Sequence, residues 1–565
     1  VSWARRCALE TGNKPTEINE MNEHAFLLSP QESLISRCMT SFISGDDYYM
    51  SEKETIDSIL EDIKKVDPLF VCKLAIYARN KGNMRSVSHL LAAAMAKAIS
   101  GEEYAKRFYE KIVVRPDDMS EILSAYASLN GIDLKDIKKI PNSIKKGFKK
   151  NLENLDAYQI DKYKMKRRNI SLVDLVRLFH PQPTQKNTEA YKRLIEGKSL
   201  ADLYESKVLE KEMTKAGQKT INASEEDKMK AKEEAIASVL DNVKGMPIMN
   251  LIRNLRNILL ITPNKVDDAC EQLRIRDKII NSRLLPFRFA TAYTEIERLE
   301  YTEKNEVKTE ILFEKDIKSN KISREEFYIL KDKILNALED AINIAVEANI
   351  PQIGEEGSAT AILCDNSGSM RGDYHNTSKV SLFSKTTTAD IGNLFGAMVA
   401  KRQENVYVGL FGDKLINAPI NRKKGILEYA KEIDELGKTC GYSTEQGIYD
   451  FMRQVIKEKK RVDNVVVFSD CQIGSRNAYD RFTPWYGISN SERSSTFQEL
   501  FKEFRKINPM CHWVVVNLKQ VKNNSVFDPK SRITNIAGWS EKIFDIINSN
   551  SIGWKSMIDE INKIE

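Results

Sequence analysis

The sequence lacks the patterns that mark several common classes of protein. Its eight cysteines include no C-x-x-C pair and no regular spacing, which argues against a zinc module or a disulfide framework and favours reduced thiols. No apolar run approaches the roughly 18 residues of a membrane span. Basic residues exceed acidic ones only by 87 to 81, so the total charge indicates no partner. We therefore expect a cytoplasmic protein without a membrane span.

Residues 1–350 show the periodicity of a helical-repeat domain. Apolar residues recur at three- and four-residue spacing, and glycine or proline separates the segments. Short turns favour packed helix pairs of the HEAT-like kind, although no sequence repeat of fixed period is present. A charged excursion at 205–245 is expected to be a solvated helix, with disorder as the alternative. The expected helices are 33–44, 54–66, 69–81, 86–99, 102–112 and, after a charged stretch at 303–333, 333–349.

Residues 351–565 alternate between strand and helix patterns. Short apolar runs indicate buried strands, and amphipathic segments between them indicate helices. This alternation predicts a doubly wound α/β domain with a mainly parallel sheet. The expected strands are 359–364, 406–411, 465–468 and 513–517, and the expected helices are 389–403, 424–436, 445–459, 496–507 and 554–564.

The loop after the first of these strands is the most informative stretch of the chain. Asp365, Ser367 and Ser369 form an Asp-x-Ser-x-Ser pattern, Thr444 precedes a later helix, and Asp470 ends another strand. All lie where parallel strands end, which is where ligand crevices form in α/β sheets. Oxygen ligands suit a hard divalent cation such as Mg²⁺, and the spacing resembles the metal-ion-dependent adhesion site of von Willebrand A domains. The alternative is that these side chains only cap helices.

This metal motif contains no obvious catalytic base. No histidine lies within it, and the adjoining Cys364 and Cys471 are expected to pack inward rather than to react. A metal-assisted nuclease would need a second metal or a base near Asp365, and the sequence indicates neither. We therefore predict a site that is not enzymatic and that coordinates a partner's carboxylate more readily than it activates water.

A basic segment at 138–168 is the main candidate for binding nucleic acid. It carries eleven Lys or Arg and three acidic residues, although the rest of the chain is nearly balanced. Cations in a row can neutralise phosphates, and an aromatic ring beside them can stack on unpaired bases. A merely solvated helical face is the alternative. The candidate contacts are Lys145, Lys146, Lys149, Lys150, Lys162, Tyr163, Lys164 and Arg167.

His180 lies at the end of an apolar helix pattern and precedes Pro181. By itself this placement is typical of a capping or packing residue.

The interpretation changes when neighbouring segments are considered, because 146–183, 246–255 and 285–290 resemble the TROVE module of Ro ribonucleoproteins. A TROVE region followed by a von Willebrand A domain is the order of that family, and the resemblance covers nearly the whole chain. One residue near Met165 is additional to the family pattern.

The resemblance implies a ring of HEAT-like helical repeats closed by the A domain, in a monomeric RNA-binding protein that is not an enzyme. Ro-like proteins bind small non-coding Y RNAs on the outer surface and single-stranded ends of misfolded RNAs in the cavity, in RNA quality control. Lys162, Arg167 and His180 match family positions associated with Y RNA binding. A 3′ exoribonuclease is an expected partner if the chain is bacterial. The rival hypothesis is an adaptor whose metal binds an acidic residue of a partner protein.

Overall fold

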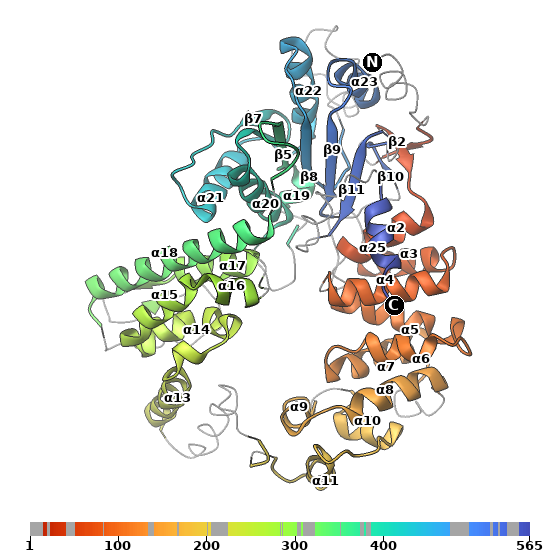
Figure 1. Ribbon diagram of the computed structural model, residues 1–565, viewed down its shortest axis with the longest axis vertical. Helices are drawn as coiled ribbons and strands as arrows, with labels where there is room; N and C mark the ends of the chain where they lie inside the picture. Colours follow the sequence, from red (N-terminus) through yellow and green to blue (C-terminus); the bar gives the residue numbers. More distant parts are fainter. Residues whose placement is uncertain are drawn as a thin grey trace. The chain divides into compact units, whose positions relative to one another are not determined.

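The structure is a computed structural model whose packing divides the chain into two compact units (Figure 1). The first unit comprises Val1–Glu205, Gln352–Ile420 and Glu432–Glu565, and the second comprises Ser206–Pro351 and Asn421–Lys431. The residues described are 15–19, 23–40, 51–82, 84–133, 140–165, 169–200, 202–204, 224–282, 284, 286–301, 307–308, 322–350, 352–372, 378–379, 386–474, 496–519, 524–528, 531–538 and 553–565.

Helices that pack against near neighbours build the N-terminal part of the first unit. Contacts join α2 to α3, α4 to α5, α5 to α7 and α6 to α8, as the helical-repeat prediction requires. Polar caps start several of them: Ser51 and Glu54 form a capping box, and Asp67 accepts a hydrogen bond from the Phe70 N–H. The helices are α2 (Pro30–Thr40), α3 (Glu52–Ile63), α4 (Pro68–Asn80), α5 (Arg85–Ala98), α6 (Ala105–Lys111), α7 (Pro116–Leu129), α8 (Asn142–Glu153), α9 (Ala157–Lys162), α10 (Leu172–Phe179) and α11 (Thr188–Ile195).

A buried carboxylate ties three of these helices together. The Asp118 side chain, at the start of α7, accepts hydrogen bonds from Arg79 Nη2 of α4 at 2.9 Å and Arg85 Nε of α5 at 3.1 Å. His89 Nε2, also of α5, lies 3.0 Å from the same carboxylate. Burial alone would raise the pKa of Asp118, but His89 and Arg79 hold it well below its ordinary value. The helical layers are therefore joined by a charge network as well as by apolar packing.

The second unit is also mainly helical. Its long helix α18 (Arg324–Asn349) packs against α15, α16 and α17. The prediction that this helix starts at residue 333 is wrong, because the Ser323 side chain accepts a hydrogen bond from the Glu326 N–H and starts the helix earlier. The other elements are α13 (Glu225–Leu240), η2 (Val243–Gly245), α14 (Ile248–Ile261), η3 (Pro263–Lys265), α15 (Val266–Arg274), α16 (Arg276–Ser282), α17 (Pro286–Glu297), β3 (Glu300–Tyr301) and β4 (Val307–Lys308).

The charged excursion predicted at 205–245 is described only in part. Helix α13 covers its second half, whereas 205–223 lies outside the described residues. Within the part of the chain that the structure describes, no helix combines the length and the apolar character needed to cross a membrane.

The first unit also contains a six-stranded sheet in the order β11-β9-β8-β5-β6-β7. All neighbouring strands are parallel except β7, which is antiparallel to β6. The four predicted strands are confirmed, whereas β7 and β11 were missed because they lack a continuous apolar run. The strands are β5 (Ala359–Asp365), β6 (Asn405–Phe411), β7 (Leu415–Asn417), β8 (Asn464–Ser469), β9 (His512–Asn517) and β11 (Ile533–Ala537).

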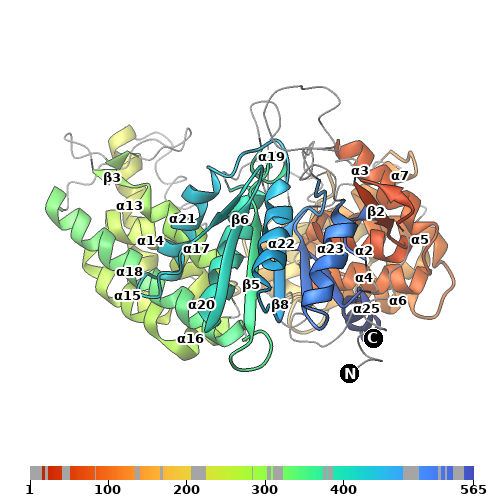
Figure 2. The ribbon, with the colours of Figure 1, turned by 90° about the horizontal axis from the view of Figure 1, so that it is seen from above.

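Helices cover both faces of this sheet, which confirms the doubly wound α/β fold (Figure 2). Alternate residues such as Leu363, Val465 and Trp513 pack against α22 and α23, and α20 covers the opposite face. The chain leaves β5 toward β6 and later returns to add β8 on the other side, so a topological switch point lies between β5 and β8. The helices are α19 (Gly368–Arg371), α20 (Thr388–Arg402), α21 (Ile426–Gly437), α22 (Gln446–Glu458), α23 (Phe497–Ile507) and α25 (Lys555–Asn562).

The prediction that residues 1–350 are almost entirely helical is wrong near the start. Strand β1 (Glu17–Ile18) pairs with β2 (His24–Leu27), and β2 pairs with β10 (Asn524–Ser525). A strand this short depends on a partner about 500 residues away, which a local pattern cannot reveal. Secondary structure does change near residue 350, but packing groups the first helices with the α/β region, so the predicted domain limits and ring closure stay predictions.

Replacing Asp118 with asparagine should destabilise the helical layers strongly. The substitution leaves the buried Arg79 without the carboxylate that neutralises it and leaves Arg85 with Asp117 alone, and breaking such a buried pair costs about 3–5 kcal/mol. Urea unfolding monitored by circular dichroism measures this loss. The exposed Asp57→Asn on α3 is the control and should leave stability nearly unchanged. A loss for Asp118→Asn as small as that of the control would contradict this role.

Candidate metal centre and basic surface

The structure brings the predicted metal ligands to one edge of the sheet. Asp365 ends β5, Ser367 and Ser369 begin α19, Thr444 precedes α22, and Asp470 follows β8. None of the five is more than 3% exposed. Three loops therefore meet at the carboxyl ends of β5, β6 and β8, beside the topological switch point.

Hydrogen bonds hold the first loop in place. Asp365 accepts from the Ser367 N–H at 3.0 Å and from Ser469 Oγ at 2.6 Å. The hydroxyls of Ser367 and Ser369 lie 3.1 Å apart. Ser367 occupies the N-cap position of α19, but its side chain makes no capping hydrogen bond. The hydroxyl pair therefore points to a binding role more than to helix capping.

The second loop is fixed by a carboxylate that the sequence analysis missed. Asp413 Oδ1 accepts from the Thr444 N–H at 2.7 Å and from Thr444 Oγ1 at 3.0 Å. Because the hydroxyl proton is directed to Asp413, the oxygen lone pairs of Thr444 remain for another partner. The Gly368 N–H donates to the Tyr442 carbonyl at 3.1 Å and so joins the first and second loops. Asp413 lies two residues after the expected strand 406–411. Its position at a strand end is the signal by which the sequence could have identified it.

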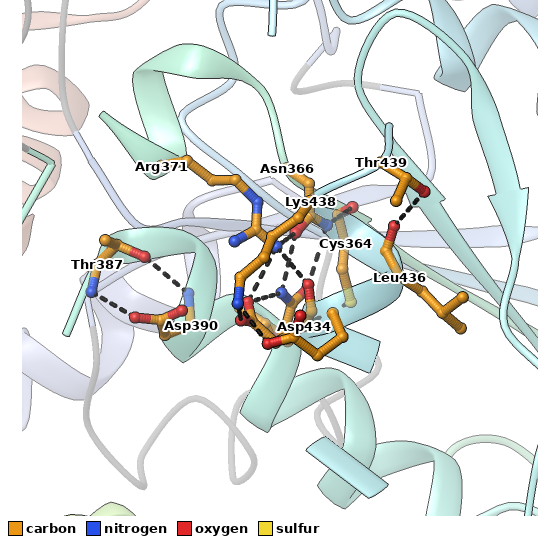
Figure 3. A network of polar contacts seen from close by, with 12 residues as sticks. Cys364, Asn366, Arg371, Thr387, Asp390, Asp434, Leu436, Lys438 and Thr439 are labelled. Carbon is orange, nitrogen blue, oxygen red and sulfur yellow. Dashed lines mark hydrogen bonds and ion pairs between the residues drawn. The ribbon is translucent and has the colours of Figure 1, made fainter. Parts of the chain in front are cut away.

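A polar network supports the first loop, residues 365–369 (Figure 3). Asn366 donates to the Cys364 carbonyl at 3.0 Å and accepts from Asn393 Nδ2 at 2.9 Å. Arg371 donates to Asn366 and, at 2.9 Å, to Asp434 Oδ1 of α21. Helices α20 and α21 therefore fix the backbone that presents Asp365 and Ser367. As predicted, Cys364 and the nearby Cys471 are buried.

Crowded carboxyl groups give this edge a strong preference for positive charge. Burial and the neighbouring Asp470 raise the pKa of Asp365 to about 7. Burial, Asp365 and Asp470 raise the pKa of Glu445 well above its ordinary value, and Glu445 Oε2 has no hydrogen-bond partner within the described structure. A cation bound here would relieve this repulsion, so the donor set fits a hard divalent ion. Glu445 is a second residue that the sequence analysis missed.

Carboxylates alone do not complete a metal site here. Among the described residues, no group of three or more His, Cys, Asp or Glu side chains is arranged to hold a metal ion. A cation would therefore depend on the hydroxyls of Ser367, Ser369 and Thr444, and on water, in addition to the carboxylates. That combination is typical of Mg²⁺, which keeps several waters when bound to protein.

The basic surface is centred on helix α8. Lys146 and Lys150 are exposed on it, whereas Lys145 and Lys149 are partly buried. Within the described residues, none of these four lysines forms an ion pair. Gly147 allows the close approach of α8 to α6, because a Cβ at this position would lie 2.5 Å from Tyr109 Cβ. The lysines therefore project from a tightly packed helix.

The remaining candidate contacts lie after α9 and α10. Lys162 is exposed at the end of α9, Tyr163 follows it, and Lys164 pairs with Asp161 at 2.6 Å. His180 is exposed and ends α10 in the left-handed conformation, with φ 46°. Its neighbour Phe179 packs edge-on against Phe148 of α8, which brings the end of α10 to the basic helix.

Two details of this segment bear on the predictions made from sequence. Arg167 lies outside the described residues, so its position stays open. Met165 has a φ of 53°, a left-handed conformation uncommon for residues other than glycine. The additional residue near Met165 thus coincides with a local turn of the backbone.

Comparison with known proteins identifies the family. The TROVE domain family matches residues 12–244 and 232–355, which together are more than half of the chain. The chain is a member of the TROVE-domain family. The resemblance to the TROVE module that the sequence indicates is therefore confirmed.

Relatives of this TROVE protein include telomerase protein component 1 of two rodents. The Rattus norvegicus protein is 22% identical over 332 residues, which are 47% of this chain and 13% of that protein. The Mus musculus protein is 24% identical over 131 residues, 23% of this chain and 5% of that protein. This chain thus spans only a small part of the length of these relatives.

The fold of this TROVE protein is similar to that of the Deinococcus radiodurans RO (RSR) protein in its crystal structure. The TM-score is 0.53 at 13% identity, and the match covers 93% of this chain and 100% of that one. At this identity the likeness concerns the fold alone. It agrees with a helical region followed by a von Willebrand A-like α/β region, as predicted.

Stability in the presence of a chelator should depend on pH through Asp365. Its folded pKa of about 7 lies above the ordinary 3.8, so the folded state keeps a proton that the unfolded state loses between these values. Stability from this group therefore falls as pH rises from about 4 to about 7, by up to about 1.4 kcal/mol per pH unit. Urea unfolding across this range should show a shallower fall for Asp365→Asn. The partly exposed Asp450→Asn should keep the wild-type slope, and equal slopes in both variants would contradict the assignment.

Proposed function

We propose that this chain is an Ro-like RNA-binding protein that is not an enzyme. It binds small non-coding, Y-like RNA and single-stranded ends of misfolded RNA, and acts in RNA quality control and ribonucleoprotein assembly. The observation that carries the proposal is the α8 face, where Lys146 and Lys150 are exposed and unpaired among the described residues, in a member of the TROVE-domain family. A cytoplasmic monomer that presents RNA to a 3′ exoribonuclease is part of this proposal.

Electrostatic capture explains how the surface would select RNA. Lys146 and Lys150 lie one helical turn apart, and Lys162 and His180 follow at the ends of the next two helices. Lysines contact phosphates as point charges, which positions RNA without reading its base sequence. Selection would therefore rest on the shape of the RNA and on unpaired segments.

The metal centre is a separate part of the proposal. Asp365, Ser367, Ser369, Thr444 and Asp470 would hold one Mg²⁺ ion. The ion would supply positive charge to the crowded carboxyl groups and keep the three loops together. Asp413 would hold Thr444 in the orientation that leaves its lone pairs toward the ion.

A second candidate function is a metal-dependent protein adaptor. It is favoured by Tyr442, which is 49% exposed and whose carbonyl is bonded to the Gly368 N–H of the metal loop. An exposed tyrosine beside a cation is a suitable anchor for a protein partner. In this reading the ion binds an acidic residue of the partner, and the basic surface is dispensable.

Reversing two charges on α8 should weaken RNA binding. Lys146→Glu combined with Lys150→Glu replaces attraction to phosphates by repulsion, so we expect Kd to rise by at least about tenfold and its salt dependence to become shallower. Fluorescence anisotropy with a labelled stem–loop RNA that has a single-stranded 3′ end measures both. Lys53→Glu combined with Lys457→Glu is the control, because both lysines are exposed elsewhere. Equal RNA affinity of the two double variants would show that the surface is misplaced.

Removing one carboxylate should separate the two candidate functions. Magnesium should stabilise the folded wild-type chain by about 2.7 kcal/mol when its concentration is one hundred times Kd. The melting temperature should rise accordingly. Asp365→Asn should lose this gain and keep its RNA affinity, whereas Asp450→Asn should keep both. The adaptor function instead predicts that a protein partner dissociates from Asp365→Asn. If neither Mg²⁺ nor Mn²⁺ changes the melting temperature of the wild-type chain, the metal centre is refuted.

A further inference from the structure

Two cations share one aromatic ring beside the basic surface. Arg115 Cζ lies 5.4 Å from the centroid of the Tyr163 ring, and Lys162 Nζ lies 5.7 Å from the same centroid. Lys162 and Tyr163 end α9, whereas Arg115 comes from the start of α7. The fold therefore adds to the predicted basic segment a cation that lies outside it in sequence.

The guanidinium of Arg115 is held in place. Its Nε and Nη2 donate to the two carboxylate oxygens of Asp117 at 3.1 and 3.0 Å. Its backbone N–H donates to Asp118 Oδ2 at 2.9 Å, so the charge network that joins α4, α5 and α7 also fixes this residue. The Arg115 side chain nevertheless remains 47% exposed. An arginine ordered in advance loses less conformational freedom when it binds an anion.

The network behind Arg115 has more positive than negative charge. Among the described residues, its ion pairs join three guanidinium groups to two carboxylates, namely Arg79, Arg85, Arg115, Asp117 and Asp118. Arg79 is buried and Arg85 is 31% exposed, so Arg115 is the most exposed cation of the set. The excess charge is thus presented to solvent at the position where Arg115 meets Tyr163.

The two lysines that flank Tyr163 differ in their surroundings. Lys162 Nζ donates to the Tyr158 hydroxyl at 3.2 Å and lies 5.4 Å from the centroid of that ring, and the residue is exposed. Lys164 is only 24% exposed and pairs with Asp161 at 2.6 Å. Lys164 is therefore less accessible to a further anion than Lys162 or Arg115.

We propose that Arg115 and Lys162, which both lie beside the Tyr163 ring, clamp the phosphate backbone of single-stranded RNA, and that Lys164 takes no part. The proposal rests on the RNA-binding function proposed above and specifies its ligand. Cations beside aromatic rings are the arrangement by which proteins bind unpaired nucleic acid. The Tyr163 ring lies within 6 Å of both cations, so both can act on the same stretch of RNA backbone.

Matched charge removals in the full-length chain test this clamp. The probe is a fluorescein-labelled oligouridylate, which cannot form a stem, and the readout is anisotropy at several salt concentrations. Arg115→Gln and Lys162→Gln should each raise Kd about fivefold or more and lower the salt slope by about 0.7 per lost phosphate contact. Lys164→Gln removes the same charge two residues away and should change neither value.

Two outcomes would overturn the clamp. The first is an Arg115→Gln variant with the affinity and salt slope of the wild type. The second is a Lys164→Gln variant that weakens binding as much as Lys162→Gln does, which would indicate only an effect of net charge. Thermal melting checks that Arg115→Gln still folds. Arg115→Lys keeps the charge and should keep the salt slope, even though it loses the two-point contact with Asp117; a slope reduced as in Arg115→Gln would count against the clamp.

Failure of the clamp can be told apart from failure of the proposed function. If reversal of Lys146 and Lys150 abolishes RNA binding while Arg115→Gln leaves it intact, RNA binding stands and the clamp is wrong. If the wild-type chain binds neither the oligouridylate nor a stem–loop RNA, both are wrong. If Arg115→Gln instead weakens binding of polyglutamate and leaves RNA affinity unchanged, the surface serves an acidic protein.

Discussion

The helical region depends on a buried carboxylate that collects positive charge. Asp118 accepts from Arg79 and Arg85 and fixes the backbone of Arg115, so three helices share one electrostatic centre. Removing such a centre would leave buried guanidinium groups uncompensated, which is costly. The same centre orients Arg115 toward Tyr163, and thereby connects the stability of the repeats to the surface proposed to bind RNA.

The edge of the sheet that carries Asp365 has an excess of acidic groups, the opposite of the cluster around Asp118. Burial and the neighbouring Asp470 raise the pKa of Asp365, and burial, Asp365 and Asp470 raise the pKa of Glu445. Supporting residues on α20 and α21 hold the loop in this arrangement. A site of this kind is built at a cost in stability, and a cation is the simplest compensation that fits its oxygen donors. The proposed RNA surface and the proposed metal centre thus have opposite local charge excesses.

Sequence analysis predicted the features that depend on local pattern. The apolar run before Asp470 identified β8, and the Asp-x-Ser-x-Ser spacing placed Asp365, Ser367 and Ser369 on one buried loop. It missed features that depend on distant partners. Strand β2 exists because it pairs with β10, and Arg115 joins the basic surface only because α7 packs beside the segment after α9. Asp413 was missed because its link to Thr444 joins the loop after β6 to the loop between α21 and α22.

Ultraviolet cross-linking of RNA to the native protein in its own cells tests the central claim most directly, with the RNA sequenced and the cross-linked peptides mapped. The account predicts small structured RNAs and RNAs with single-stranded 3′ ends on peptides from α8 to α10, together with the peptide that contains Arg115. Recovery of protein partners without RNA, or of RNA cross-linked only to peptides away from this surface, would contradict it.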